Sequence, residues 1–284
     1  MVFDESLLSP LSAADVIIPN WPRIPCVRAV FTTRVGGVSA PPYGQWRNGQ
    51  ALPGGLNLAF HTGDDPQCVT ENRARLAAFT GARPAWLKQI HHTQVIRAET
   101  VLDQDGALYA DATVATQPNL ACVVTSADCL AVLICDTAGR AVGAAHAGWR
   151  GLSAGVLEHT ATEVATAAGA GSTLTAFLGP AIGPRAFEVG DDVRDAFMDS
   201  AQPDEYHVTA AAFHPYAAAP GKYRANLYAL ARVRLARAGI TRISNGAWCT
   251  FSEPERFYSY RRDHPKNGNQ AAMIWLTDNV DPEK

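Results

Sequence analysis

Two apolar runs, separated by only three residues, most constrain how this chain can fold. The runs are LACVVTS at 120–126 and LAVLICD at 130–136, and Ala127, Asp128 and Cys129 lie between them. Each run has the length and the β-branched content of a strand buried on both faces. We therefore expect two buried strands, with Cys129 at their junction.

The segments after these runs predict an α/β fold. The turn TAGR at 137–140 leads to a third apolar run at 141–147, and an apolar stripe then predicts a helix over 150–168. Strands followed closely by a helix are typical of α/β folds, so we expect one domain over residues 1–284. Further elements are expected as helices over 66–80, from Asp191 and over 226–238, and as strands at the start of 174–184, at 246–251 and at 271–276.

The composition fits a folded enzyme and excludes several partners. Hydrophobic residues make up 47% of the chain, charged residues make up 18%, and the formal net charge is −3. Since Lys and Arg form no dense cluster, the attraction that drives binding to nucleic acids or membrane surfaces is missing. Asp4 and Glu5 stand where a signal peptide would be positive, and the six cysteines form no C-x-x-C pair. We therefore expect a cytoplasmic protein with reduced thiols.

Cys129 is the first candidate for chemistry. Free cysteine is often a buried packing residue, and this interpretation suits Cys122 and Cys135, which lie within the apolar runs. It suits Cys129 less well, because Ser126 and Asp128 break the apolar pattern there. A junction between strands is also a common place for reactive groups. Both interpretations of Cys129 remain open at this point.

His146 lies in the segment AAHAGWRG, between a strand and a helix. It could be a hydrogen-bonded core histidine. Alternatively, Gly148 and Gly151 would let backbone approach a ligand, and Arg150 would complete an anion site at the start of the helix. The same segment could simply be a tight strand–helix turn.

His91 and His92 follow the segment WLKQI, and alternation along an extended chain would turn only one of them inward. If His91, Cys129 and His146 converge, one thiolate and two imidazoles form a set that suits zinc, with copper as a possible substitute. Three protein ligands leave a fourth position open, as in catalytic sites. Spacing alone does not show that they converge.

These segments together resemble the YfiH/DUF152 family, also called the laccase-domain or multicopper polyphenol oxidase family. The resemblance implies a layered α/β fold of mixed sheets flanked by helices, akin to a bacterial toxin with a Cys-His site. It also implies that the family's metal-binding set falls on His91, Cys129 and His146. The resembling segments are FTTRVGGVSAPPY at 31–43, GLNLAFHTGDD at 55–65, ENR at 71–73, KQIHHTQV at 88–95, TSADCLAVLICD at 125–136, AAHAGWRGL at 144–152, LGPAIGPRAFEVGDDV at 178–193 and FYSYRRD at 257–263.

The activity implied by the resemblance is a zinc-dependent purine nucleoside phosphorylase, with adenosine deamination as a further activity. Its partners would be phosphate and adenosine, inosine, guanosine or methylthioadenosine, and the expected substrate contacts are Arg34, Asn57, Arg150 and Gly151. An alternative is an editing amidohydrolase that removes L-serine from a UDP-linked peptidoglycan precursor. A copper oxidase is disfavoured, because the chain has no His-x-His pair.

The sequence departs from the family pattern at two positions near the expected site. His92 stands where the family usually has glycine, so we expect it at the pocket mouth or in solvent rather than on the metal. Asn269 stands where the family commonly has arginine, which puts an anion contact there in doubt. The Pro- and Gly-rich segment 40–55 is expected to be a loop that could cover a site, and its part at 45–54 is longer than in a minimal member of the family.

Overall fold

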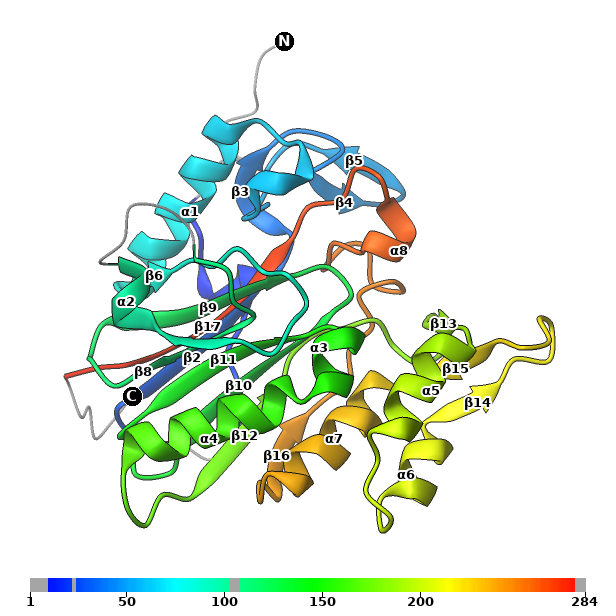
Figure 1. Ribbon diagram of the computed structural model, residues 1–284. Helices are drawn as coiled ribbons and strands as arrows, with labels where there is room; N and C mark the ends of the chain where they lie inside the picture. The colour runs from blue at the N-terminus through cyan, green and yellow to red at the C-terminus, as the bar shows by residue number, and fades with distance from the viewer. Residues whose placement is uncertain (1–9, 22–23, 103–107, 279–284) are drawn as a thin grey trace.

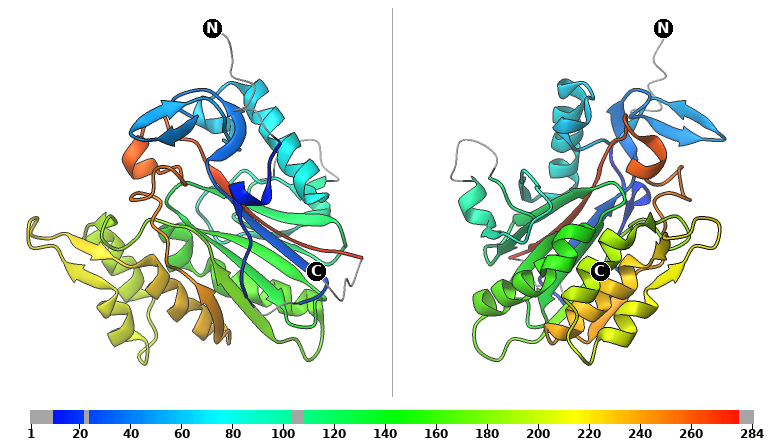
Figure 2. Two further views of the ribbon diagram at one scale, coloured as in Figure 1. Left: turned by 180° about the vertical axis from the view of Figure 1, so that it is seen from behind. Right: turned by 45° about the vertical axis from the view of Figure 1, so that its right-hand side comes forward.

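The computed structural model describes residues 10–21, 24–102 and 108–278, so Asp4 and Glu5 lie outside the described residues (Figure 1). Two β-sheets pack face to face between helices (Figure 2). The first sheet has the order β1 (Val16–Ile17), β2 (Val27–Thr32), β17 (Gln270–Leu276), β9 (Leu120–Ser126), β6 (Arg83–Ala85). The second has the order β16 (Arg242–Asn245), β12 (Leu174–Leu178), β10 (Leu130–Asp136), β11 (Val142–Ala147), β8 (Ala112–Ala115), β7 (Val95–Arg97).

Helices cover the outer faces of the two sheets. Helix α1 (Pro66–Thr80) packs on the first sheet through Leu76, and α4 (Val156–Ala168) and α7 (Leu227–Arg237) cover the second. The remaining helices are α2 (Ala98–Leu102), α3 (Trp149–Ala154), α5 (Asp191–Asp199), α6 (Tyr206–Ala211), α8 (Tyr260–Asp263) and the short η2 (Ala13–Asp15) and η3 (Phe60–Thr62). The remaining strands are β3 (Val35–Ser39), the pair β4 (Gln45–Arg47) and β5 (Gln50–Leu52), and the small sheet β13 (Glu188–Val189), β15 (Tyr223–Ala225) and β14 (Phe213–Pro215).

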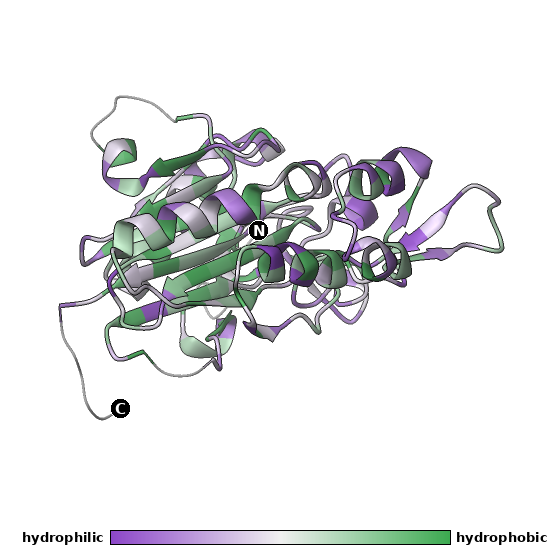
Figure 3. Ribbon diagram, turned by 60° about the horizontal axis from the view of Figure 1, so that its bottom comes forward, coloured by the Kyte–Doolittle hydropathy of each residue, from purple (hydrophilic) through white to green (hydrophobic). Residues whose placement is uncertain are grey.

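Every residue of β9 and β10 is buried, which confirms the expectation of two strands buried on both faces. In β9, alternate residues join the core between the sheets and the core beneath α1, while those of β10 join the core between the sheets and the core beneath α4. Figure 3 accordingly shows hydrophobic residues along the central strands. The two strands belong to different sheets, however, and the chain crosses from one sheet to the other at Ala127, Asp128 and Cys129.

Most other predicted elements are confirmed, with three differences. The helix expected over 150–168 is divided into α3 and α4 at Gly155, whose φ of 103° is a left-handed conformation that favours glycine. The segment 246–251 is not a strand, because β16 ends at Asn245 and the chain turns at Gly246 with a φ of 102°. The segment 40–55 is not all loop: β4 and β5 form a hairpin whose turn is Asn48-Gly49, both with positive φ.

No helix within the described ranges combines the length and the apolar character needed to cross a bilayer.

Cys122 and Cys135 are packing residues in this fold. Both are fully buried in the core between the sheets, and burial raises the pKa of Cys122 to about 12 and that of Cys135 further. Replacing Cys122 with Ala is expected to lower the free energy of unfolding by about 1 kcal/mol and leave metal content unchanged. Urea denaturation and metal analysis check this, and metal loss from the variant would mean that Cys122 takes part in the site.

Candidate active site

Three residues predicted from the sequence lie close together, each in a connection between strands or near the end of one. His91 lies in the connection between β6 and β7, Cys129 at the crossing from β9 to β10, and His146 near the end of β11. Their candidate ligand atoms all lie within 4.8 Å of one another. The Cys129 Sγ is 3.9 Å from the His91 Nε2, and the imidazole rings of His91 and His146 meet edge to face. The expected convergence therefore occurs in this fold.

Asp111, just before β8, orients both histidines, and sequence reasoning missed it. Its buried carboxylate accepts a 2.8 Å hydrogen bond from Nδ1 of His146 and bonds from the backbone N–H groups of Ile90, His91 and His92. Burial opposes this charge, but the hydrogen bonds keep the pKa of Asp111 below its usual value. An acid directly before the apolar segment ATVA was the sequence signal for this role.

The backbone at His91 explains why only one of the adjacent histidines reaches the site. His91 has a φ of 62°, so the segment turns there, and strand alternation is not the reason for the separation of the two side chains. His92 instead lines a cavity of about 390 Å³ with residues of the same loop and of α4, including His159. The expected outcome holds, but its physical cause is a turn fixed by Asp111.

Replacing His92 with Gly is therefore expected to leave metal content unchanged and to alter activity by less than about threefold. The backbone N–H of residue 92, which binds Asp111, persists in the variant. Mass spectrometry of the intact protein and an assay of base release measure both properties. If the variant lost its metal, the register assigned to this segment would be wrong by one residue.

The charges in the site favour a thiolate. Burial raises the pKa of Cys129, but the imidazoles of His146 and His91 outweigh burial and lower it to about 6. Burial lowers the pKa of His146, whereas Cys129 and Asp111 raise it to about 9. A thiolate at neutral pH is the form that binds a metal or acts as a nucleophile.

Gly148 leaves room beside the three side chains. A Cβ atom at this position would lie 2.9 Å from the Cys129 Sγ and 3.0 Å from the His91 Cδ2. Gly151, one turn further into α3, is similarly tight, since a Cβ there would lie 2.8 Å from the carbonyl oxygen of His92. Gly148 thus lies directly against the three side chains, while Gly151 packs against the loop that carries His91.

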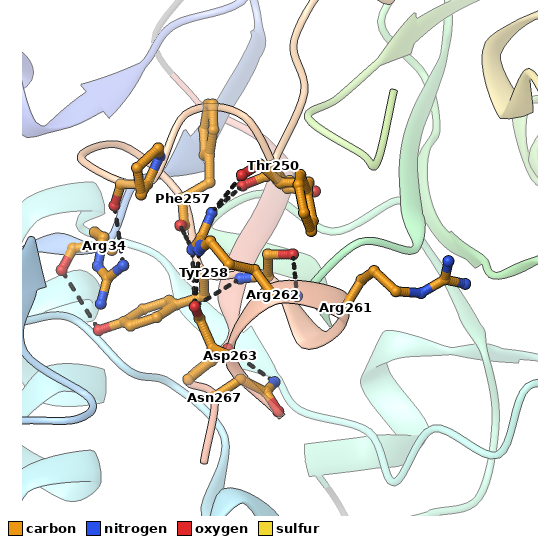
Figure 4. Close-up of polar contacts among 12 residues, drawn as sticks. Arg34, Thr250, Phe257, Tyr258, Arg261, Arg262, Asp263 and Asn267 are labelled. Atoms are coloured by element: carbon orange, nitrogen blue, oxygen red, sulfur yellow. Dashed lines mark hydrogen bonds and ion pairs between the residues drawn. The ribbon is translucent and has the colours of Figure 1, made fainter. Parts of the chain in front are cut away.

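Asp128 fixes the crossing that carries Cys129. Its buried carboxylate accepts hydrogen bonds from the hydroxyls of Thr250 and Ser259 and from the backbone N–H of Arg261. Figure 4 shows the segment that supplies these groups, where Arg262 binds the carbonyl oxygens of Thr250 and Phe257 and the carboxylate of Asp263. The Arg261 side chain extends away from this cluster (Figure 4).

Two of the expected substrate contacts have structural roles instead. Arg34 is 2% exposed, and its guanidinium donates to the carbonyl oxygens of Gly44 and Pro254. Asn57 is fully buried, with its amide bound to Thr62 and Asp64 and its oxygen bound to backbone N–H groups. Neither side chain has a surface that a substrate can touch in this conformation.

Arg150 and Gly151, the other two expected contacts, lie beside the site. Arg150 is exposed at the start of α3, with its guanidinium over the Trp149 ring. Asn269, where the family commonly has arginine, is buried, and its backbone N–H binds the Asn57 oxygen.

The three donors fit a single metal ion. Tetrahedral bonds of about 2.0 to 2.3 Å place ligands roughly 3.5 Å apart. The Cys129 Sγ and the His91 Nε2 are 3.9 Å apart, and all three ligand atoms lie within 4.8 Å of one another. Asp111 occupies Nδ1 of His146, so Nε2 is the nitrogen available to a metal. His91 is exposed and Cys129 half-buried, which leaves one side of the group accessible. Across the described part of the chain, this is the one group of three such donors.

Comparison with known proteins places these features in a family. A family model described as "Multi-copper polyphenol oxidoreductase laccase" matches residues 28–277. The chain is 45% identical to a purine nucleoside phosphorylase of Pseudomonas aeruginosa, over 92% of this chain and 98% of that protein. It is also 45% identical to the purine nucleoside phosphorylase YfiH of Escherichia coli, over 93% and 99%.

Two solved structures have the same fold as this chain. A DUF152 protein from Neisseria meningitidis superposes with a TM-score of 0.80 at 42% identity, covering 93% of this chain and 99% of that one. The protein YlmD from Geobacillus stearothermophilus superposes with a TM-score of 0.79 at 26% identity, covering 95% and 99%.

Proposed function

Because the chain belongs to the YfiH/DUF152 laccase-domain family, we propose that it is a zinc-dependent purine nucleoside phosphorylase. The observation that supports this most is the His91–Cys129–His146 group, held by Asp111 and open on one side. In the reaction, phosphate oxygen forms a bond to C1′ of the ribose while the bond from C1′ to the base nitrogen breaks. For adenosine, inosine and guanosine the products are ribose 1-phosphate and a free base that has taken up a proton, and methylthioadenosine gives 5-methylthioribose 1-phosphate and adenine. Adenosine, inosine, guanosine and methylthioadenosine are the proposed substrates, and adenosine deamination is a proposed second activity.

His91, Cys129 and His146 would hold the zinc ion through Nε2, Sγ and Nε2. When bound, zinc supplies Lewis acidity at the open side of the group. Copper remains a possible occupant, but a multicopper centre needs several sets of ligands, and the described residues bring together one.

The chain's own residues orient this chemistry. Asp111 holds the proton at Nδ1 of His146, which fixes the tautomer and directs Nε2 into the site. The same carboxylate fixes the turn at His91, so one buried group sets the position of both rings. Gly148 keeps the space beside them free for substrate. From the sequence, Arg150 and the N–H of Gly151 at the start of α3 are candidate phosphate contacts.

The proposal is tested by metal analysis followed by product analysis. Purified protein is expected to carry about one zinc per chain. Adenosine with phosphate is expected to yield adenine and ribose 1-phosphate, and base release should require phosphate. If the zinc-loaded protein released no base under these conditions, the phosphorylase proposal would be wrong.

A second function is supported by one observation. Cys129 has a pKa of about 6 and lies beside His146, which Asp111 orients. A thiol nucleophile, a histidine and an orienting carboxylate form the same arrangement in cysteine-dependent hydrolases. This favours an amidohydrolase that removes L-serine from a UDP-linked peptidoglycan precursor. The two functions are distinguished by assaying both substrates at the same zinc loading and again after chelation. Serine release that survives chelation would identify Cys129 as the nucleophile.

A further inference from the structure

Arg73 of α1 contacts two aromatic rings through its guanidinium group. Its guanidinium carbon lies 4.5 Å from the centre of the Phe60 ring and 3.9 Å from that of Trp86. Its Nε donates a 2.9 Å hydrogen bond to the carbonyl oxygen of Leu58. Two cation–π contacts and the hydrogen bond from Nε together restrict how the guanidinium can turn, and so restrict the directions of its terminal N–H groups.

The charge of Arg73 has no protein counterion among the residues that the structure describes. Burial lowers its pKa to about 10, so it remains a cation at neutral pH. Two arginines that are almost fully buried have more partners than Arg73. Arg234 pairs with Glu158, and all three nitrogens of Arg34 donate to carbonyl oxygens. Of the three guanidinium nitrogens of Arg73, only Nε has a hydrogen-bond partner among the residues that the structure describes.

Partial burial of a cation without a counterion costs free energy, and a bound anion would offset that cost. The terminal nitrogens of an arginine present paired N–H donors that match two oxygens of a phosphate. Partial burial of the guanidinium beside these rings strengthens its interaction with an anion.

The position of Arg73 connects it to the candidate active site through His61. His61 lies near enough to Arg73, His91 and His146 that their charges, after burial, lower its pKa. Trp86, on which Arg73 stacks, belongs to the segment that leads to His91. Arg73 and the metal-binding group therefore border the same region of the molecule.

Buried hydrogen bonds hold the segment that presents Phe60 and His61. The side chain of Asn57 binds Thr62 and Asp64. Asn72, the neighbour of Arg73 on α1, donates to the carbonyl oxygen of Asn57. This explains why Asn57 is fully buried: it fixes the loop beside the site rather than contacting a substrate.

We propose that Arg73, with His61 beside it, binds the inorganic phosphate that attacks the nucleoside. The inference rests on the proposed phosphorolysis, and it assigns the phosphate to a stacked arginine on α1 rather than to the exposed Arg150. Phosphate supplies the anion that Arg73 lacks and brings negative charge next to His61. Neutral His61 donates one hydrogen bond to the same anion.

The test compares Arg73→Gln and Arg73→Lys with Arg75→Gln. The last removes an arginine of the same helix that pairs with Glu71. For Arg73→Gln, the KM for phosphate is expected to rise roughly 10- to 100-fold, while the KM for inosine changes less than about threefold. Arg73→Lys should show a smaller rise, because it keeps the charge but loses the paired donors. Arg75→Gln should match the parent protein within about twofold.

Calorimetric titration with inorganic phosphate separates this inference from the proposed function. The parent protein should bind phosphate, and Arg73→Gln should bind it at least about 10-fold more weakly, whether or not any nucleoside is cleaved. If the parent protein bound phosphate but cleaved no nucleoside, the phosphorylase proposal would fail and the Arg73 site would stand.

Two results would overturn the inference. One is an unchanged phosphate affinity and an unchanged KM for phosphate in Arg73→Gln, or in Arg73→Lys if the Gln variant does not fold by circular dichroism. The other is a loss of affinity for phosphate esters with no loss of affinity for inorganic phosphate. If Arg73→Gln weakened inhibition by UDP but not the use of inorganic phosphate, Arg73 would bind a substrate's own phosphate instead.

Discussion

Cys129→Ala is expected to lose most of its zinc and at least about 10³-fold in kcat/KM for phosphorolysis while remaining folded. Cys129 contributes the only thiolate of the three-donor group, and its pKa of about 6 makes it the anionic ligand at neutral pH. Two imidazoles alone hold zinc weakly. The measurements are zinc content by mass spectrometry, initial rates of base release, and the circular dichroism spectrum.

Cys68→Ala is a matched control for this variant. Cys68 is also half-buried, but it lies on α1 and contacts the carbonyl oxygen of Val38. It should keep full zinc content and activity, whereas His91→Ala should behave like Cys129→Ala. If Cys129→Ala kept its zinc and its activity, the assignment of the site would be wrong.

Asp111→Asn is expected to weaken zinc binding about 10- to 100-fold and to reduce activity similarly. The buried carboxylate accepts four N–H donors, from His146 and from the backbone of residues 90–92. An amide in its place would turn one N–H group toward those donors, so the turn at His91 and the ring of His146 would both lose their support. The free energy of unfolding should fall by about 2 to 3 kcal/mol.

Asp136→Asn provides the matched control, since Asp136 is also fully buried and hydrogen-bonded, at the end of β10 with Arg140. It should lower stability without changing zinc affinity. Zinc affinity is measured by competition with a chelating dye, and stability by urea denaturation of both metal-free variants. Equal zinc affinity in Asp111→Asn and the parent protein would show that Asp111 supports only the fold.

Local patterns in the sequence predicted most individual elements. The helix over 66–80 was predicted from Pro66 near its start and Gly81 after its end, and both residues have these positions in α1. The hairpin at residues 45–52 was missed, although Asn48-Gly49 is a strong signal for a two-residue turn, because the surrounding segment is rich in Pro and Gly.

The arrangement of the strands could not be predicted in the same way. An apolar run buried on both faces has the same composition whether its neighbour in sequence pairs with it or lies in an opposing sheet. The separation of β9 from β10 depends on Asp128, whose φ of 83° and bonds to Thr250 and Ser259 involve residues distant in the sequence. No local pattern contains that information.

The same distinction applies to the site. The three metal donors were identified through the family resemblance, since spacing alone did not show that they converge. Arg34 and Asn57, which lie in segments that resemble the family, were expected to contact substrate. The structure gives both of them buried backbone partners instead, which depend on contacts such as that between Asn57 and the backbone of Asn269.

The position of β17 affects how the protein is made. This strand lies between β2 and β9 in the first sheet, yet it is the last of the five to be translated. Until β17 has been synthesised, β2 and β9 each present an unpaired edge that is open to pairing with another chain. The first sheet therefore becomes continuous only once β17 has inserted between β2 and β9, although all the other strands of both sheets precede it in the chain.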